Sequence, residues 1–368
     1  MAITRLGPNQ DITAAKIAGQ INFKNLIING DMSLAQRGTS TSSITSGGYK
    51  TLDRFNIDIN SAGTWTMSQS TTVPSGQGFA TSLKMDCTTA DASLSASDYL
   101  IVRTLLEGQN LQQLKFGTSS AESLTLSFWV RSNKTGTYAV WFYADVGNKS
   151  FSKTYTIDSA DTWEKKTITI NGDTASSFSN NNSIGLRINW YLAAGTTYTS
   201  GTLPTDWQTD SNGDRAVGQV NLADSTDNEW YITGVQLEAD TSASDFEFIP
   251  YDVNLQRCKR YYEMISDGRL DSDGVVATAM CHQTNVIALN YQWYPKRTTP
   301  SISQVSGTNF FRFQRSGGVE DFNSIKIYIP NATTGLIYSD DGVTATTGQV
   351  GWVNMNSATG YVALDAEL

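Results

Sequence analysis

Short runs in which apolar and polar residues alternate constrain the fold of this chain more than any other feature. Residues 124–130 read LTLSFWV, and every second position from Leu124 to Val130 is apolar. The longest such stripe comprises Ile184, Leu186, Ile188, Trp190 and Leu192. Because neighbouring side chains of a β-strand point to opposite sides, this period predicts half-buried strands.

The same alternation recurs along the chain, for example at Tyr138, Val140 and Phe142. Gly, Asn, Asp and Ser separate the runs, and many short strands divided by such turns are typical of a β-sandwich or jelly roll. We therefore predict an all-β protein. Residues 97–114 break the pattern: they fit a helix that ends near Gly108 or a strand followed by a turn, and we favour the strand and turn.

Residues 230–262 predict how the sandwich closes. Trp230 and Ile232 point to one side, whereas Val235 and Leu237 point to the other, with Gly234 between them. A one-residue change of face at a glycine indicates a β-bulge.

After this bulge we predict a last strand over residues 246–251 and an amphipathic connector over residues 255–262. The connector ends in CKRYY, two bases followed by two tyrosines. We expect the tyrosines to pack between domains while Lys259 and Arg260 meet nearby acidic residues.

The length of 368 residues exceeds what a single core usually supports, so we predict more than one domain. Residues 1–25 form a short N-terminal segment, with Asp11 capping a brief helix, that suits either an attachment arm or a strap on its own domain. Residues 26–252 form the jelly-roll sandwich. Residues 253–368 contain a further set of short strands, which predicts a second, smaller β domain.

Composition excludes several function classes. The formal net charge of −9 would repel nucleic acid and acidic membranes. The chain has no run of 18 apolar residues and no apolar stretch of signal-peptide type at its start, so we expect neither membrane insertion nor export by that route. Cys87, Cys258 and Cys281 are far apart, and we expect them to be small buried residues of a protein made in a reducing cytoplasm.

Several phrases, in order, resemble phage tail-fibre and related virion fibre proteins. They are NLIINGDMSLAQRGTS (25–40), YKTLDRFNI (49–57), LLEGQNLQQLKFG (105–117), SLTLSFWVRSNKTGTYAVWFY (123–143), ADTWEKKTITI (160–170) and ITGVQLEADTSASDFEFIPYDVNLQRCKRYY (232–262). The resemblance implies a jelly roll similar to carbohydrate-binding modules, followed by a distal β domain.

The same resemblance implies a location and partners. The protein would be a virion component, in a tail- or capsid-attached fibre, and would be made in the host cytoplasm. It would form a homotrimer, join other tail or capsid proteins through its N-terminal segment, and expose its C-terminal domain, which would be a candidate receptor-binding domain.

The loop over residues 191–219 contains the chemistry that glycan binding needs, namely flat aromatic rings beside polar side chains. We predict Tyr191, Tyr198 and Trp207 as aromatic platforms, and Asp206, Gln208, Asn212 and Arg215 as polar partners. Long loops without a strand pattern are often functional. The same aromatics would also suit the edge of the sandwich or a subunit contact.

Within that loop, Asp210, Asn212 and Asp214 have a D-x-N-x-D spacing that places oxygen ligands around calcium. The pattern departs from an EF-hand because Arg215 replaces the glycine and Asn221 takes the place of the final glutamate. An Asx-rich turn explains the same residues. We therefore expect no cofactor, with a structural calcium ion as the alternative.

Catalytic motifs are sparse. His282 is the one histidine, and it follows Cys281 in a predicted strand, where the two side chains point to opposite faces. We therefore expect no enzymatic activity. The sequence predicts a phage fibre protein that mediates adhesion to host-surface glycans; the alternatives are a tail or capsid structural or adaptor protein without receptor binding, and a polysaccharide depolymerase.

Overall fold

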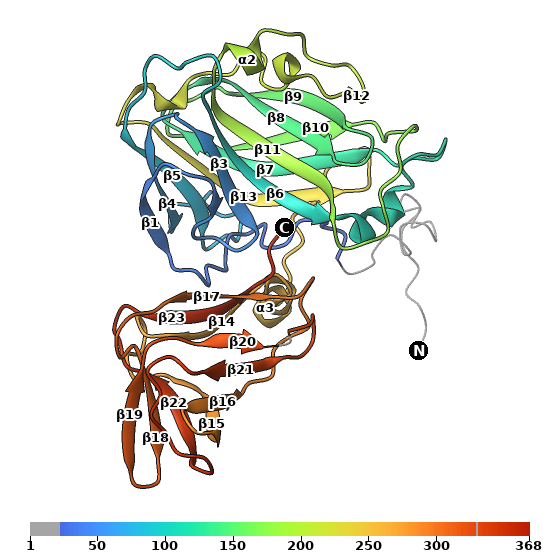
Figure 1. Ribbon diagram of the computed structural model, residues 1–368. Coiled ribbons are helices and arrows are strands. Elements are labelled where there is room, and N and C mark those ends of the chain that lie inside the picture. Colours follow the sequence, from blue (N-terminus) through green and yellow to red (C-terminus); the bar gives the residue numbers. More distant parts are fainter. Residues whose placement is uncertain (1–22, 329) are drawn as a thin grey trace, which may run out of the picture.

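The computed structural model describes residues 23–328 and 330–368. The predicted helix after Asp11 lies outside the described residues. Figure 1 shows two β domains, one above the other, with helix α3 (Tyr251–Lys259) where they meet. No helix among the described residues is long and apolar enough to cross a lipid bilayer.

The first domain consists of two antiparallel sheets. In spatial order, the six-stranded sheet contains β1 (Ser40–Ile44), β4 (Thr64–Ser70), β5 (Ser82–Thr89), β13 (Glu229–Glu238), β7 (Leu124–Ser132) and β10 (Glu164–Ile170). The seven-stranded sheet contains β12 (Gln208–Thr209), β9 (Lys149–Ile157), β8 (Gly136–Ala144), β11 (Ile184–Ala194), β6 (Tyr99–Glu107), β3 (Phe55–Asn60) and β2 (Gly48–Tyr49). The chain passes repeatedly from one sheet to the other, which makes the sandwich a jelly roll.

Short helical segments join some of these strands. They are η1 (Gly108–Leu114), α2 (Thr196–Thr199), η2 (Asn212–Asp214) and η3 (Leu222–Asp224). Residues 97–114 thus contain the favoured strand, β6, followed by the 3-10 helix η1.

The core lies between the two sheets and contains the predicted apolar stripes. Trp190 of β11 is fully buried and meets Phe128 of β7 edge to face, with ring centroids 6.0 Å apart. Across the same layer, Trp230 Nε1 donates to the Tyr155 hydroxyl at 3.3 Å. Large aromatic side chains contribute most of the apolar area that such cores remove from water.

The predicted bulge is confirmed at Gly234. The register between β13 and β7 shifts between Thr233 and Gln236, and Gly234 has a φ of +62°. In a regular strand Ile232 and Val235 would point to opposite sides, as the alternation alone indicates, but the shift at Gly234 brings both of them into the core.

The predicted last strand over residues 246–251 is wrong. Residues up to Pro250 form an irregular segment, and α3 begins at Tyr251. The Glu247 N–H donates to the Gln236 side chain at 2.8 Å, so a side chain takes the place of a neighbouring strand. Pro250 lacks an N–H group and stands at the N-cap of the helix, which ends the extended segment.

The second domain also contains two antiparallel sheets. The smaller has β14 (Tyr262–Asp267), β23 (Tyr361–Asp365) and β17 (Ser301–Val305). The larger has β19 (Gly318–Phe322), β18 (Phe311–Arg315), β22 (Val350–Met355), β15 (Val275–Gln283), β16 (Val286–Asn290), β21 (Leu336–Ser339) and β20 (Lys326–Tyr328). In β15, Cys281 is buried and His282 is exposed, which confirms that they face opposite sides.

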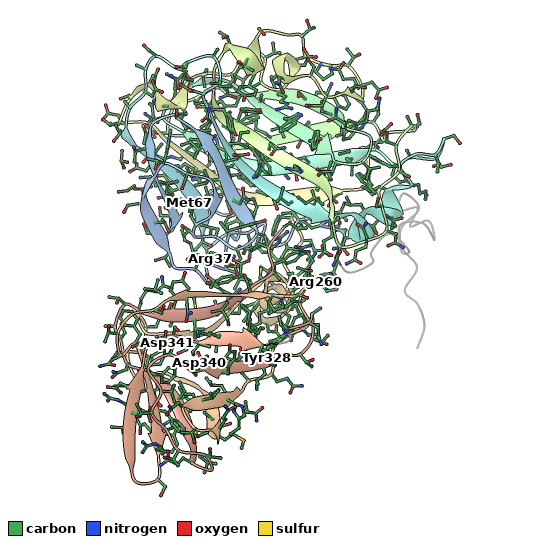
Figure 2. All side chains as sticks on the ribbon, in the orientation of Figure 1. Arg37, Met67, Arg260, Tyr328, Asp340 and Asp341 are labelled. Carbon is green, nitrogen blue, oxygen red and sulfur yellow. The ribbon has the colours of Figure 1, made fainter. Side chains whose placement is uncertain are left out.

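The junction between the domains is buried and charged. Tyr261 and Tyr262 are 1% and 2% exposed, and Arg260 pairs with Glu107 at the end of β6, which confirms the predicted role of CKRYY. Figure 2 shows Arg37 and Arg260 between the two bodies. The predicted boundary at residue 252 falls in the first turn of α3, a helix whose last residues lie in this junction.

Two arginines of the first domain hold the second. The Arg37 guanidinium lies 3.6 Å from the ring centroid of Tyr262, and that of Arg54 lies 3.5 Å from the ring centroid of Tyr261. Both arginines also form ion pairs with Glu367, which follows the last strand. The second domain is therefore fastened where its chain enters and again just after strand β23.

Candidate functional site

The loop over residues 195–219 folds back onto the seven-stranded sheet, on the side that points away from the core. Tyr191 is 1% exposed beneath it, so its ring offers no free face. Tyr198, half-buried, meets Tyr99 edge to face with ring centroids 5.3 Å apart. In Figure 1 this loop, with α2, lies at the end of the sandwich farthest from the second domain.

Trp207 belongs to a different cluster. Its Nε1 donates to the carbonyl of Asn171 at 2.6 Å, and its ring packs edge-on against Phe116 and Phe151. The structure therefore brings Tyr191 and Tyr198 together but places Trp207 apart from them.

The polar residues of the loop largely bind one another. The Arg215 guanidinium lies 4.3 Å from the ring centroid of Trp141 and pairs with Asp210, which also accepts from Trp141 Nε1 at 3.1 Å. Gln208 donates to Asp214 at 2.8 Å. Asp206 accepts from the N–H of the next residue, and the Asn212 side chain is exposed.

These contacts bear on the predicted calcium site. Asp210 is already neutralised by Arg215, and Asp214 accepts from both Gln208 and the Thr202 N–H. Calcium needs several oxygens free of such partners, so this arrangement fits a hydrogen-bonded turn better than an ion. Among the described residues, no group of three His, Cys, Asp or Glu side chains is placed to hold a metal.

Beside the loop, the sheet carries polar and aromatic side chains that were not predicted from the sequence. We use the term "outer face" for the half-buried residues Asp58, Tyr99, Arg103, Tyr143, Asp145 and Arg187. They come from β3, β6, β8 and β11 and from the residue that follows β8. Strand pairing places Arg187 directly opposite Tyr143 and Ile101 opposite Asp58.

Two arginine–aspartate pairs dominate this outer face. Arg187 Nε donates to Asp145 at 3.0 Å, with its guanidinium 5.4 Å from the centroid of the Tyr143 ring. Arg103 pairs with Asp58, which also accepts from the Tyr99 hydroxyl at 3.2 Å. Paired guanidinium and carboxylate groups offer both donors and acceptors next to the tyrosine rings.

The protonation states suit hydrogen bonding at neutral pH. The hydrogen bond that the Arg187 guanidinium donates to Asp145 raises the pKa of Arg187, which stays charged. Burial, and then the charge of Asp58, raise the pKa of Tyr99 to about 12, so its hydroxyl keeps its proton.

The alternation of the strands contains the signal that would have found this face. In β8 the core residues are Tyr138, Val140 and Phe142, so Trp141 and Tyr143 must point outward. Aromatic side chains on the solvent side of a strand are a reason to look for a ligand surface.

Comparison with known proteins finds proteins of similar structure but none of similar sequence. No protein-family profile matches the sequence, and no curated protein matches it. The enzymatically active domain of bacteriophage CBA120 tailspike protein 4 aligns at 12% identity over 59% of this chain and 21% of its own, with a TM-score of 0.31.

Two carbohydrate-binding modules also align. TmCBM61, solved with β-1,4-galactotriose, shares 10% identity over 59% of this chain and 99% of its own, with a TM-score of 0.29. The CBM22-2 xylan-binding domain of Paenibacillus barcinonensis Xyn10C shares 13% identity over 50% of this chain and 91% of its own, with a TM-score of 0.27. The jelly-roll assignment of this chain therefore rests on its own two sheets.

Proposed function

We propose that this protein is a non-enzymatic virion fibre component, a phage tail fibre, that attaches the particle to glycans of the host surface. The observation that carries the proposal is the outer face, where Tyr143 lies beside the Arg187–Asp145 pair. A sugar ring stacks on a tyrosine through its C–H groups, while its hydroxyls pair with charged groups at the edge.

The loop over residues 195–219 borders the outer face and forms a wall beside it. Because Arg215, Asp210 and Trp141 fix the loop to the sheet, the neighbouring side chains keep their positions before any ligand arrives. A surface that is already ordered loses less entropy on binding.

The virion location, the attachment through the N-terminal segment and the homotrimer rest on the sequence resemblance to tail-fibre proteins. Three copies would present three outer faces, and weak sugar contacts would then combine into avid attachment. Imaging of particles labelled with an antibody to the C-terminal domain tests the location: label at fibre tips supports it, whereas label confined to the tail or capsid wall contradicts it.

The binding experiment uses the full chain, a panel of oligosaccharides and two matched variants. Arg187 and Arg131 each pair with an aspartate and lie near a tyrosine ring, at 5.4 Å and 5.0 Å from the ring centroid, but on opposite sheets. We expect Arg187→Ala to weaken glycan binding at least tenfold and Arg131→Ala to leave it unchanged. Equal effects of the two variants would contradict a site on the outer face.

A structural or adaptor role is a second candidate, because the second domain exposes an apolar patch. Met280 of β15 and Val350 of β22 are paired across the strands and are 48% and 61% exposed, and Trp352 beside them is 46% exposed. Such patches often mark protein contacts. Absence of binding to every glycan, together with concentration-dependent association that Trp352→Ser abolishes, would favour this role.

The non-enzymatic part of the proposal has its own test. Purified protein is incubated with host polysaccharide, and released sugar is measured. Release would indicate a depolymerase and contradict the proposal.

A further inference from the structure

The opposite side of the sandwich contains a small cavity that the outer face does not use. It has a volume of about 300 Å³ and lies against the six-stranded sheet, between the loop that precedes β5 and the irregular segment that precedes α3. Its aromatic walls are Phe79, Trp129, Phe246 and Phe248.

The bulge at Gly234 makes room for this cavity. A Cβ on Gly234 would lie 2.6 Å from the Phe79 ring, so the absence of a side chain lets that ring rest on the sheet. Phe79, Phe246 and Phe248 then pack against one another, with ring centroids 4.9 to 5.1 Å apart.

The irregular segment is held firmly enough to form a wall. The Glu247 N–H donates to the Gln236 side chain, and the Glu247 carboxylate accepts from the N–H groups of Phe23 and Asn25 at 2.8 and 2.9 Å. These bonds tie the segment to β13 and to residues 23–25. The aromatic walls are therefore in place without a ligand.

The rim of the cavity carries three exposed polar side chains, Gln77, Lys165 and Asp245. Within residues 23–328 and 330–368, the side chains of these three residues form no hydrogen bond or ion pair with another group of the protein. An amide, an ammonium group and a carboxylate are thus free to bind a ligand next to aromatic faces.

This combination matches the chemistry of a sugar. Phe248 is 52% exposed and Trp129 is half-buried, so two rings present apolar faces to the solvent. A pyranose offers a flat C–H face to such rings and a ring of hydroxyls to donors and acceptors. A purely apolar partner would leave Lys165 and Asp245 without use.

We propose that this cavity is a second glycan site, which binds one pyranose residue between Trp129 and Phe248, with hydroxyls paired to Gln77, Lys165 and Asp245. The inference rests on the proposed glycan-binding function and adds a site on the opposite side of the sandwich. One protein chain would then contact two sugar residues that lie far apart on a host surface.

The test uses ligand-observed NMR on the full chain with the methyl pyranosides of glucose, galactose, mannose and N-acetylglucosamine. Trp129→Ala is compared with Trp163→Ala, which removes another half-buried tryptophan, directly before β10 and outside the cavity. We expect Trp129→Ala to weaken binding of at least one sugar tenfold or more, and Trp163→Ala to leave it unchanged.

A double variant, Gln77→Ala with Lys165→Ala, covers the case in which Trp129→Ala fails to fold, because both side chains are exposed. We expect it to weaken the same sugar at least fivefold. Sugar binding that is unaffected by the Trp129 and rim variants but is lost in Arg187→Ala would overturn this inference and leave the proposed function standing. No binding of these sugars or of the oligosaccharide panel to the unaltered chain would overturn both.

Discussion

Arg260 and Glu107 form a two-point ion pair across the domain junction. The guanidinium Nε and Nη2 each lie 2.8 Å from a carboxylate oxygen, and the Tyr261 hydroxyl donates to the same carboxylate at 2.5 Å. The Glu107 side chain is fully buried, whereas that of Arg260 is 30% exposed. One carboxylate thus anchors two neighbouring residues of the second domain.

Glu107→Gln should destabilise the protein. Removing one partner of a buried pair often costs about 3 to 5 kcal/mol, and the partial exposure of Arg260 reduces our expectation to about 2 kcal/mol. Chemical denaturation measures the change. Glu122→Gln is the control, because it breaks the exposed pair with Lys115 and should cost less than about 1 kcal/mol. Equal costs for the two variants would contradict a special role of the junction.

The contribution of Glu107 should depend on pH. Burial by itself raises the pKa of this carboxyl, but hydrogen bonds from Arg260 and Tyr261 outweigh burial and leave the pKa below its usual value of 4.5. The stabilisation is therefore complete above about pH 5 and is lost as the pH falls through the lowered pKa. The difference in unfolding free energy between the unaltered chain and Glu107→Gln should shrink in acid, and a constant difference would contradict this account.

Gly234→Ala should be more harmful than Gly76→Ala. Both glycines have positive φ, +62° and +72°, but only at Gly234 would a new Cβ meet another group, the Phe79 ring at 2.6 Å. We expect a loss of about 1 kcal/mol at Gly76 from backbone strain and of more than about 2 kcal/mol at Gly234, where packing is disturbed as well. Thermal and chemical unfolding of the two variants provide the comparison.

Arg215→Ala should loosen the loop over residues 195–219. The variant loses the ion pair with Asp210 and the contact with Trp141. Limited proteolysis with thermolysin should cut this loop faster, while global unfolding changes by less than about 1 kcal/mol. Lys134→Ala, which removes an ion pair with Asp224 elsewhere, should not accelerate cleavage in the loop. Unchanged cleavage in Arg215→Ala would show that other contacts fix the loop.

Calcium should have no effect on stability. A stabilising ion at 100 times its dissociation constant would add about 2.7 kcal/mol and raise the Tm by several degrees. Because Asp210 and Asp214 already have protein partners, we expect the same Tm with calcium and with a chelator, within about 1 °C. A calcium-dependent rise that disappears in Asp214→Asn would restore the calcium interpretation.

The parts of the fold that depend on neighbouring residues were predictable from the sequence. The alternation around Phe128 and Trp190 predicted the core, and the change of face at Gly234 predicted the bulge, because both patterns are local. The strand predicted over residues 246–251 failed for a nonlocal reason. The partners of Glu247 are the side chain of Gln236 and the N–H groups of Phe23 and Asn25.

The same distinction applies to the surfaces. The sequence could indicate that Tyr143 and Arg103 point outward, but not that β3 lies beside β6, which brings Asp58 to Arg103. The aromatic residues of the loop were predicted from its composition. Composition does not say whether a ring such as that of Tyr191 is buried in the folded protein. Exposure of a residue in a long loop is decided by the complete fold.

The double fastening of the second domain has a mechanical consequence. The chain enters that domain at Tyr262 and returns at Asp365, and these two residues are directly paired in adjacent antiparallel strands. Arg37 lies on Tyr262 and also pairs with Asp365. A domain attached at a single point can swivel, whereas one attached at two ends passes torque to its neighbour. A sideways force on the second domain would therefore rotate the sandwich together with it.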